Sequence, residues 1–320
     1  MLKHALAFLL ALALAAPAFA QTPKRLVVFG DSLSDSGNAF ALLGATNTPP
    51  DWSVDPFLIP DRPYARGGLH FSNGPTWVEQ FARPLALAGD ARPALRSTSP
   101  GAANYAVGGA RARDDHASFN LPQQVAQFLN DHGGAAPSDA LYVIAIGGND
   151  LRDAVVAFVT VLQGGGTLPQ AQAAAGQVIS DAVTAIGTNM QFLASRGAQR
   201  FLVWRLPNVG LTPALRAAGL TGLGDALAQG FNGALEANVL SPLAAGGLGI
   251  LRLDVYTALN QIVANGAAFG LSNTTTACIT PNVAPFTCQH PDEFLFWDGI
   301  HPTAAGHALI AQQAAALLGH

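Results

Sequence analysis

The sequence predicts an α/β fold, in which helices cover both faces of a parallel sheet. Short runs of β-branched and aromatic residues alternate with longer segments whose apolar residues recur at helical spacing. No internal repeat and no linker rich in Gly, Ser or Pro divides the 320 residues. We therefore expect one domain built on a five-stranded parallel sheet.

The expected strands are short apolar runs that end in glycine or polar residues. The first is broken by Gly30, the second runs into Gly108 and Gly109, and the third ends at Gly147. The five strands lie near residues 26, 104, 142, 202 and 251, and we expect the last of these to be the final strand of the chain.

Helices are predicted between and after these strands. The apolar residues from Ile179 to Leu193 step by four and three positions, as one face of a helix does, and Gly197 is expected to end that helix. Residues 212–241 should be mostly helical. Other helices are expected to begin near Trp77, Leu121, Leu151 and Pro302.

The residue pattern at the N-terminus predicts that the protein is exported. Lys3 and His4 precede an apolar run over 5–16, and Ala18-Phe19-Ala20 has the small-x-small form of a cleavage site. The run is too short to span a bilayer, so we expect a signal peptide at 1–20, a mature domain over 21–320 and no transmembrane anchor. The protein is then secreted, to the periplasm or beyond it. An uncleaved anchor is the alternative.

The composition does not favour a nucleic-acid-binding protein, and it indicates how the cysteines are used. The net charge is −4 and charged residues make up 11%, which gives no basic surface for nucleic acid. Cys278 and Cys288 are the only cysteines, and in an exported chain this spacing predicts one disulfide. Free or metal-binding thiols are the alternative, although the spacing is not that of a CxxC pair. The oligomeric state has no signal in the sequence.

Residues 45–72 form a long irregular connection. Its Trp52, Phe57, Ile59 and Tyr64 are expected either to line an apolar substrate wall or to form a small core beneath the loop, and both interpretations stay open.

Ser32 is the candidate nucleophile. It follows Gly30 and Asp31 at the carboxyl end of the first strand, where parallel α/β sheets bind ligands, and we expect a helix to begin there. The alternative is that Asp31 and Ser32 are ordinary helix N-caps.

The candidate base lies near the other end of the chain. Asp298 and His301 are three residues apart on a turn, so the carboxylate can accept the imidazole Nδ1–H and leave Nε2 facing outward. Alternatively, both are ordinary turn residues. An oxyanion would need donors, and the Ser32 N–H, the Gly109 N–H and the Asn149 amide lie at three strand ends. Gly108 is the alternative to Gly109, and Asn149 could instead be an N-cap.

Four segments together resemble the GDSL lipases/esterases of the SGNH hydrolase superfamily. They are Gly30-Asp31-Ser32-Leu33, Asn104 to Ala110, Gly147-Gly148-Asn149-Asp150 and Asp298 to Thr303. The resemblance implies a three-layer α/β/α, flavodoxin-like fold. It also implies a nucleophile at Ser32, an orienting Asp298, a base at His301 and an oxyanion hole completed by Gly109 and Asn149. Carboxylic ester hydrolysis without a cofactor is the implied activity.

We therefore expect a secreted serine esterase or lipase that forms an acyl-enzyme on Ser32 and acts on small-molecule or lipid-like esters. Acyl transfer to an alcohol and deacetylation of a polysaccharide are alternatives at the same site. A non-catalytic lipid- or carbohydrate-binding module is a third. A metal-dependent hydrolase is not favoured, because no HExxH motif or cluster of metal ligands occurs. Acyl chain length and alcohol preference have no signal in the sequence.

Overall fold

The main sheet has four parallel strands in the order β1-β2-β3-β4. The computed structural model describes residues 22–42, 70–96, 101–279 and 287–319. The strands are β1 (Arg25–Gly30), β2 (Ala140–Ala145), β3 (Arg200–Arg205) and β4 (Gly249–Asp254). The predicted signal peptide lies outside the described residues, as does the aromatic connection from Trp52 to Tyr64.

The prediction of five strands is corrected to four, because residues 103–107 lie beside β1 without forming a full strand. The Val28 N–H donates to the Ala103 carbonyl, and the Val28 carbonyl accepts from Tyr105 N–H, at 2.9 and 2.7 Å. One more backbone bond follows, from the Val107 N–H to the Gly30 carbonyl at 3.2 Å, but no second bridge forms between the two segments. The reason is that the Gly30 N–H, the next donor along β1, is taken by the side-chain oxygen of Gln124 at 2.9 Å.

A second, smaller sheet follows β4, the strand that was expected to be the last of the chain. It has two strands, β5 (Asn273–Ala277) and β6 (Phe294–Phe296), so the prediction that β4 is the final strand is wrong. The polar, threonine-rich β5 is partly exposed and lacks the apolar run by which the other strands were found.

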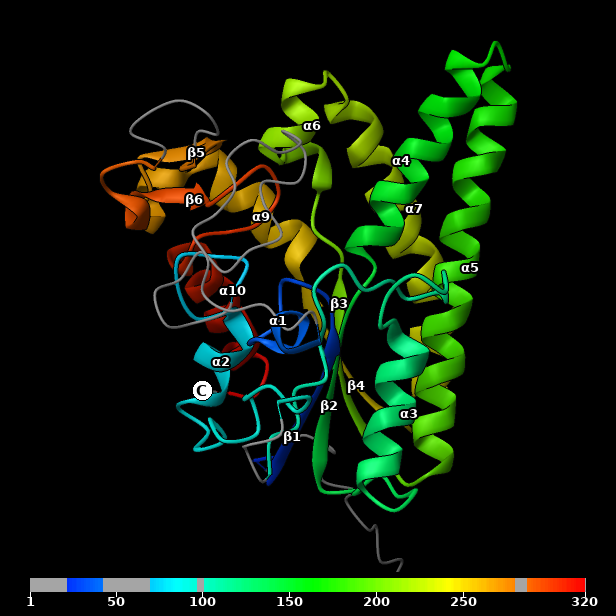
Figure 1. Cartoon of the computed structure of the whole chain (residues 1–320), viewed down its shortest axis with the longest axis vertical. Coiled ribbons are helices and arrows are strands. Elements are labelled where there is room, and N and C mark those ends of the chain that lie inside the picture. Colours follow the sequence, from blue (N-terminus) through cyan, green and yellow to red (C-terminus); the bar gives the residue numbers. More distant parts are fainter. Residues whose placement is uncertain (1–21, 43–69, 97–100, 280–286, 320) are drawn as a thin grey trace, which may run out of the picture.

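Helices cover both faces of the main sheet, as predicted (Figure 1). One face packs against α3, α4, α5 and α7, and the other against α2 and α10. The helices are α1 (Asn38–Leu42), α2 (Trp77–Ala82), α3 (Leu121–Asp131), α4 (Gly148–Gln163), α5 (Leu168–Ser195), α6 (Pro213–Ala217), α7 (Thr221–Leu235), α8 (Ser241–Ala245), α9 (Val255–Ala264) and α10 (Ala304–Ala316).

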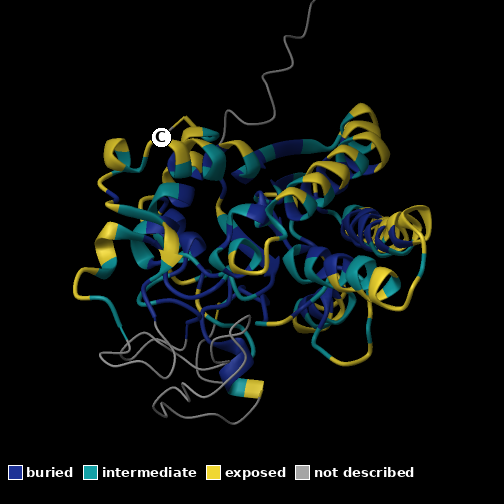
Figure 2. Cartoon of the chain, turned by 90° about the horizontal axis from the view of Figure 1, so that it is seen from above, coloured by how far each residue is buried: buried dark blue, intermediate teal, exposed yellow. Residues whose placement is uncertain are grey.

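The side chains of each strand alternate between two cores. In β1, Val27 and Phe29 enter the core beneath α3 and α5, whereas Leu26 and Val28 enter the core beneath α2 and α10. All four are buried. The strands therefore lie in the buried interior of the molecule (Figure 2), as expected for a parallel sheet covered on both faces.

Helix α4 begins earlier than predicted. Helix α4 starts at Gly148 rather than near Leu151, so Asn149 lies in its first turn and is not its N-cap. Helix α5 starts at Leu168, where Thr167 forms a capping box with Gln170. In the described ranges, no helix is long and apolar enough to cross a membrane.

A first prediction concerns the buried Gln124 side chain, which holds both backbone groups of Gly30. Its oxygen accepts the Gly30 N–H at 2.9 Å, and its nitrogen donates to the Gly30 carbonyl at 2.8 Å. Gln124→Leu leaves a buried N–H unpaired, and we expect it to lower the free energy of unfolding by about 1–3 kcal/mol in urea titration. Gln127→Leu is the control, because this half-buried side chain of α3 makes only a solvent-exposed hydrogen bond to Asp131, and the change should alter stability by less than about 0.5 kcal/mol. An equal effect of the two substitutions would contradict the prediction.

Candidate active site

Ser32 lies in a tight turn that follows β1. The N–H groups of Ser34 and Asp35 both donate to the Asp31 carbonyl at 3.0 Å, and the Leu33 N–H donates to the Asp31 carboxylate at 3.1 Å. Helix α1 begins only at Asn38, so the expected helix start at Ser32 is wrong. The turn places the Ser32 hydroxyl at the carboxyl end of the sheet.

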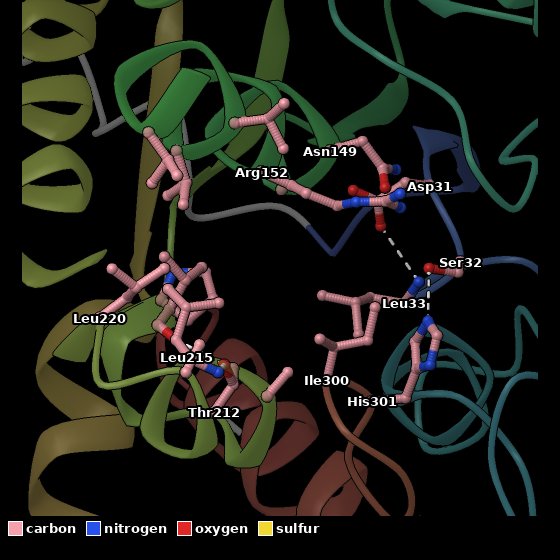
Figure 3. Close-up of a pocket in the computed structure, with 18 of the residues that line it drawn as sticks. Asp31, Ser32, Leu33, Asn149, Arg152, Thr212, Leu215, Leu220, Ile300 and His301 are labelled. Atoms are coloured by element: carbon pink, nitrogen blue, oxygen red, sulfur yellow. Dashed lines mark hydrogen bonds between the residues drawn. The ribbon is translucent and has the colours of Figure 1, made fainter. Parts of the chain in front are cut away.

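The Ser32 hydroxyl meets an imidazole from the far end of the chain (Figure 3). Ser32 Oγ lies 2.8 Å from His301 Nε2, and His301 Nδ1 lies 2.6 Å from Asp298 Oδ2. Asp298 is fully buried and His301 is nearly so. The three side chains form one continuous hydrogen-bonded chain, which is the arrangement that activates a serine hydroxyl.

The turn that carries His301 is fixed by the same carboxylate. Asp298 Oδ1 accepts the backbone N–H groups of Ile300 and His301 at 2.8 and 2.7 Å, while Oδ2 faces the imidazole. Both oxygens are therefore used, one for the backbone and one for the ring. Helix α10 begins at Ala304 with Thr303 as its N-cap, slightly later than the expected start at Pro302.

A disulfide lies on the segment that pairs with the strand before this turn. Cys278 and Cys288 are bonded, as predicted. The Cys278 and Ile279 N–H groups donate to the carbonyls of Phe296 and Trp297 at 3.0 and 2.9 Å, which extends the β5–β6 pairing to the residue before Asp298. The covalent loop is thus attached to the segment that holds the carboxylate.

The backbone N–H groups of Gly108 and Gly109 differ in whether they already have a hydrogen-bond acceptor. The Gly108 N–H donates to the Asp35 carboxylate at 2.8 Å, so it is already occupied. Gly109 is exposed and has a φ of 82°, a conformation that favours glycine. Its N–H makes no hydrogen bond to any described residue, and a Cβ added there would meet no described atom within 4 Å. Of the two glycines, Gly109 therefore has the donor open to a ligand.

Asn149 is tied to the same loop. Its amide nitrogen donates one hydrogen bond to the Ala110 carbonyl at 2.8 Å, which leaves a second N–H. The preceding Gly147 has a φ of 123°, and a Cβ there would lie 2.8 Å from the Phe231 ring, so only glycine fits before α4.

An apolar pocket of about 410 Å³ opens beside Ser32 and His301. Figure 3 shows it between the α4 wall, with Asn149 and Arg152, and the opposite wall, with Thr212, Leu215 and Leu220. Residue spacing along the chain does not predict this pocket. Its apolar lining is Leu33, Val155, Val156, Val159, Pro207, Val209, Ala214, Leu215, Ala218, Leu220 and Ile300. The signal present in the sequence is the set of valines at 155, 156 and 159, which is wider than the buried face of α4 needs, since Val156 is 55% exposed.

Two buried carboxyls lie under the site. Burial raises the pKa of Asp31 and of Asp150 to about 6, although each accepts backbone hydrogen bonds that oppose the shift. Asp150 Oδ2 accepts the Ala112 N–H at 2.8 Å and so holds α4 against the loop after Gly109. Over the described residues, no group of three or more His, Cys, Asp or Glu side chains is arranged to hold a metal ion.

The buried His307 imidazole should make the stability of the fold depend on pH. Its imidazole is 1% exposed, and burial, with smaller contributions from His301 and His70, lowers its pKa from 6.5 to about 3. Between these values the unfolded chain binds a proton that the folded chain does not, so stability falls as the pH falls, by up to about 1.4 kcal/mol per pH unit. His307→Leu removes this contribution. Urea unfolding from about pH 6.5 down to about pH 4 should then show a shallower loss of stability.

The matched control for this measurement is His116→Asn, because the His116 side chain is 87% exposed. The control should retain the wild-type slope of stability against pH. A slope in His307→Leu as steep as in the wild type would show that His307 titrates normally.

The chain was also compared with known proteins. A family model described as GDSL-like Lipase/Acylhydrolase matches residues 26–314. Esterase EstA of Pseudomonas aeruginosa is 31% identical over 349 residues, with 98% of this chain and 49% of that protein covered. Lipase 1 of Photorhabdus luminescens is 24% identical, with 97% and 52% covered. The chain thus spans about half the length of these two relatives.

A third relative has a length closer to that of this chain. It is the phosphatidylcholine-sterol acyltransferase of Aeromonas hydrophila, which is 25% identical, with 94% of this chain and 91% of that protein covered. The family match includes Ser32 at one end and His301 at the other. The chain belongs to the GDSL-like lipase/acylhydrolase family.

Proposed function

We propose that this protein is a serine esterase that hydrolyses carboxylic esters through an acyl-enzyme on Ser32. The observation that carries the proposal is the hydrogen-bonded chain from Ser32 Oγ through His301 to the buried Asp298, at the head of an apolar pocket. Membership of the family supports the same reaction class.

In the first half of the reaction, Ser32 Oγ attacks the acyl carbonyl carbon while His301 Nε2 takes the hydroxyl proton. Asp298 stabilises the imidazolium that forms, because its Oδ2 is already hydrogen-bonded to Nδ1. Collapse of the tetrahedral intermediate releases the alcohol, which receives the proton from His301. In the second half, His301 deprotonates a water molecule that attacks the acyl carbon. The bond to Ser32 Oγ then breaks, Oγ takes the proton back from His301, and the acid leaves.

Three donors are proposed for the oxyanion: the Ser32 N–H, the Gly109 N–H and the second N–H of Asn149. The open donor of Gly109 and the bond from Asn149 to Ala110 support this set, since the latter holds both residues at one edge. Donors that are fixed before reaction cost little reorganisation when charge develops on the carbonyl oxygen.

The apolar pocket is proposed to bind the acyl chain of the substrate. It lies directly beside Ser32 and has a volume of about 410 Å³, within the usual range for a small-molecule site. An acetyl group would leave most of it empty, so the pocket favours lipid-like esters over acetylated polysaccharides.

Acyl transfer is a second candidate, favoured by the relative that is named as an acyltransferase and matched over 91% of its length. In this reaction an alcohol, rather than water, attacks the acyl-enzyme. Adding a long-chain alcohol to the ester assay and measuring the new ester against free acid separates the two outcomes.

We also propose that the protein is exported as one domain over 21–320 after removal of residues 1–20. The disulfide supports an oxidising compartment, where such bonds persist. Sequencing the N-terminus of the protein recovered from the periplasm or the medium tests this proposal.

The first functional prediction is that Ser32→Ala lowers kcat on a nitrophenyl acyl ester by at least about 1,000-fold, because no nucleophile remains. Unfolding in urea should show that the fold is retained. Ser195→Ala, an exposed serine on α5, is the control and should keep wild-type turnover and covalent labelling by a fluorophosphonate. Wild-type turnover in Ser32→Ala would exclude the proposed nucleophile.

A second functional prediction is that Asn149→Ala lowers kcat by about 100-fold or more with little change in KM. The reason is that the lost donor acts mainly in the transition state. Asn238→Ala, at an exposed position, is the matched control. A rise in KM at constant kcat would instead place Asn149 in ground-state binding.

A further inference from the structure

The α4 wall of the pocket carries a cation. Arg152 lies one helical turn after Asn149 and lines the same pocket as Ser32 and His301. Figure 3 shows its side chain extending toward Asn149 and Asp31, at the ester end of the pocket, and away from Leu215 and Leu220. A positive charge thus faces the place where the ester group would lie.

Arg152 differs from the arginines nearby. Arg111 pairs with Asp153 and Asp115, and Arg113 pairs with Asp153 and Asp150. Arg152 is half-buried, yet among the described residues it has no hydrogen-bond or ion-pair partner. The carboxylates of this part of α4 are taken by the other two arginines.

Asp31, the only acid among the described residues that line the pocket, does not fill this role. Its carboxylate accepts the Leu33 N–H at 3.1 Å. No hydrogen bond or ion pair joins this carboxylate to Arg152, and the charged side chains that act on the pKa of Asp31 are His301 and Asp150. Asp31 therefore does not balance the charge of Arg152.

A bound substrate would cover this half-buried guanidinium and remove its remaining water, which costs free energy unless the substrate brings an anion to compensate the charge. Its planar donors match the two oxygens of a phosphate or a carboxylate, which they bind in bidentate fashion. A neutral acyl ester would satisfy the apolar lining but not this side chain. A substrate with an anionic group near its ester would satisfy both.

We propose that Arg152 binds an anionic oxygen group of the substrate, so that the preferred substrates are acyl esters that carry a phosphate or a carboxylate close to the scissile ester. This inference rests on the proposed esterase function and adds the chemical class of the substrate. The acyl chain occupies the apolar pocket, and the anion lies at its ester end against the guanidinium.

The test compares three esters with the same decanoyl chain: decanoylglycerol, decanoylglycerol phosphate and decanoylglycerol hemisuccinate. We expect wild-type kcat/KM to be at least about tenfold higher for one or both anionic esters than for the neutral one. The anionic ester with the higher kcat/KM shows whether the site prefers a phosphate or a carboxylate. Arg152→Gln should bring the anionic-to-neutral ratio close to one, and Arg152→Lys should restore part of it.

Arg83→Gln is the matched control, because it removes the same charge at an exposed position at the end of α2 and should leave the ratio unchanged. A second readout is independent of turnover: decyl phosphate should bind Ser32→Ala at least about tenfold more tightly than it binds Ser32→Ala/Arg152→Gln, in calorimetry.

A wild-type ratio near one, or a ratio that Arg152→Gln leaves unchanged, overturns the inference while leaving the esterase function intact. If wild-type protein hydrolyses none of the three esters and nitrophenyl esters as well, the esterase function itself fails. Equal binding of decyl phosphate to the two Ser32→Ala proteins also overturns the assignment of Arg152.

Discussion

One buried carboxylate, Asp35, joins the turn after β1 to the loop of Gly108 and Gly109. Its Oδ1 accepts the N–H groups of Gly37 and Asn38 at 2.7 and 2.6 Å, and its Oδ2 accepts those of Ala39 and Gly108 at 3.0 and 2.8 Å. Burial raises the pKa of Asp35, and these four donors oppose that effect.

The consequence of this constraint is a fixed distance between two segments far apart in the chain. The turn carries Ser32, and the loop carries the open N–H of Gly109. Buried asparagines reinforce the link, since Asn38 Nδ2 donates to the carbonyls of Asn104 and Ala106 at 2.7 and 2.9 Å. The proposed nucleophile and one proposed oxyanion donor are thus held by bonds that do not involve the substrate, which is the requirement for preorganised catalysis.

The other end of the site is held by different means. The Asp298 turn is attached to the second sheet and to the disulfide, whereas α4, with Asn149, is held by Asp150 and the Ala110 carbonyl. Each proposed catalytic group therefore has its own support. The pocket wall lacks such a network at Arg152, where the fold leaves a charge without a partner among the described residues.

The sequence by itself determined the α/β class and the parallel direction of the main strands, because both rest on local patterns, namely apolar runs and glycines at strand ends. It also pointed to Ser32, Asp298 and His301, whose side chains lie in one hydrogen-bonded chain and whose catalytic roles are proposed above. The disulfide was likewise readable, because only two cysteines occur.

Only the tertiary structure decided how many strands the sheet has, which glycine has an open N–H and where the pocket lies. The Gln124 side chain takes the Gly30 N–H that a full fifth strand would need, and it comes from a helix 94 residues further on. Asp35 occupies Gly108 from 73 residues away, and the pocket walls come from α4 and from the segment around α6. Contacts of this kind are set by packing between distant segments, and residue spacing along the chain does not encode them.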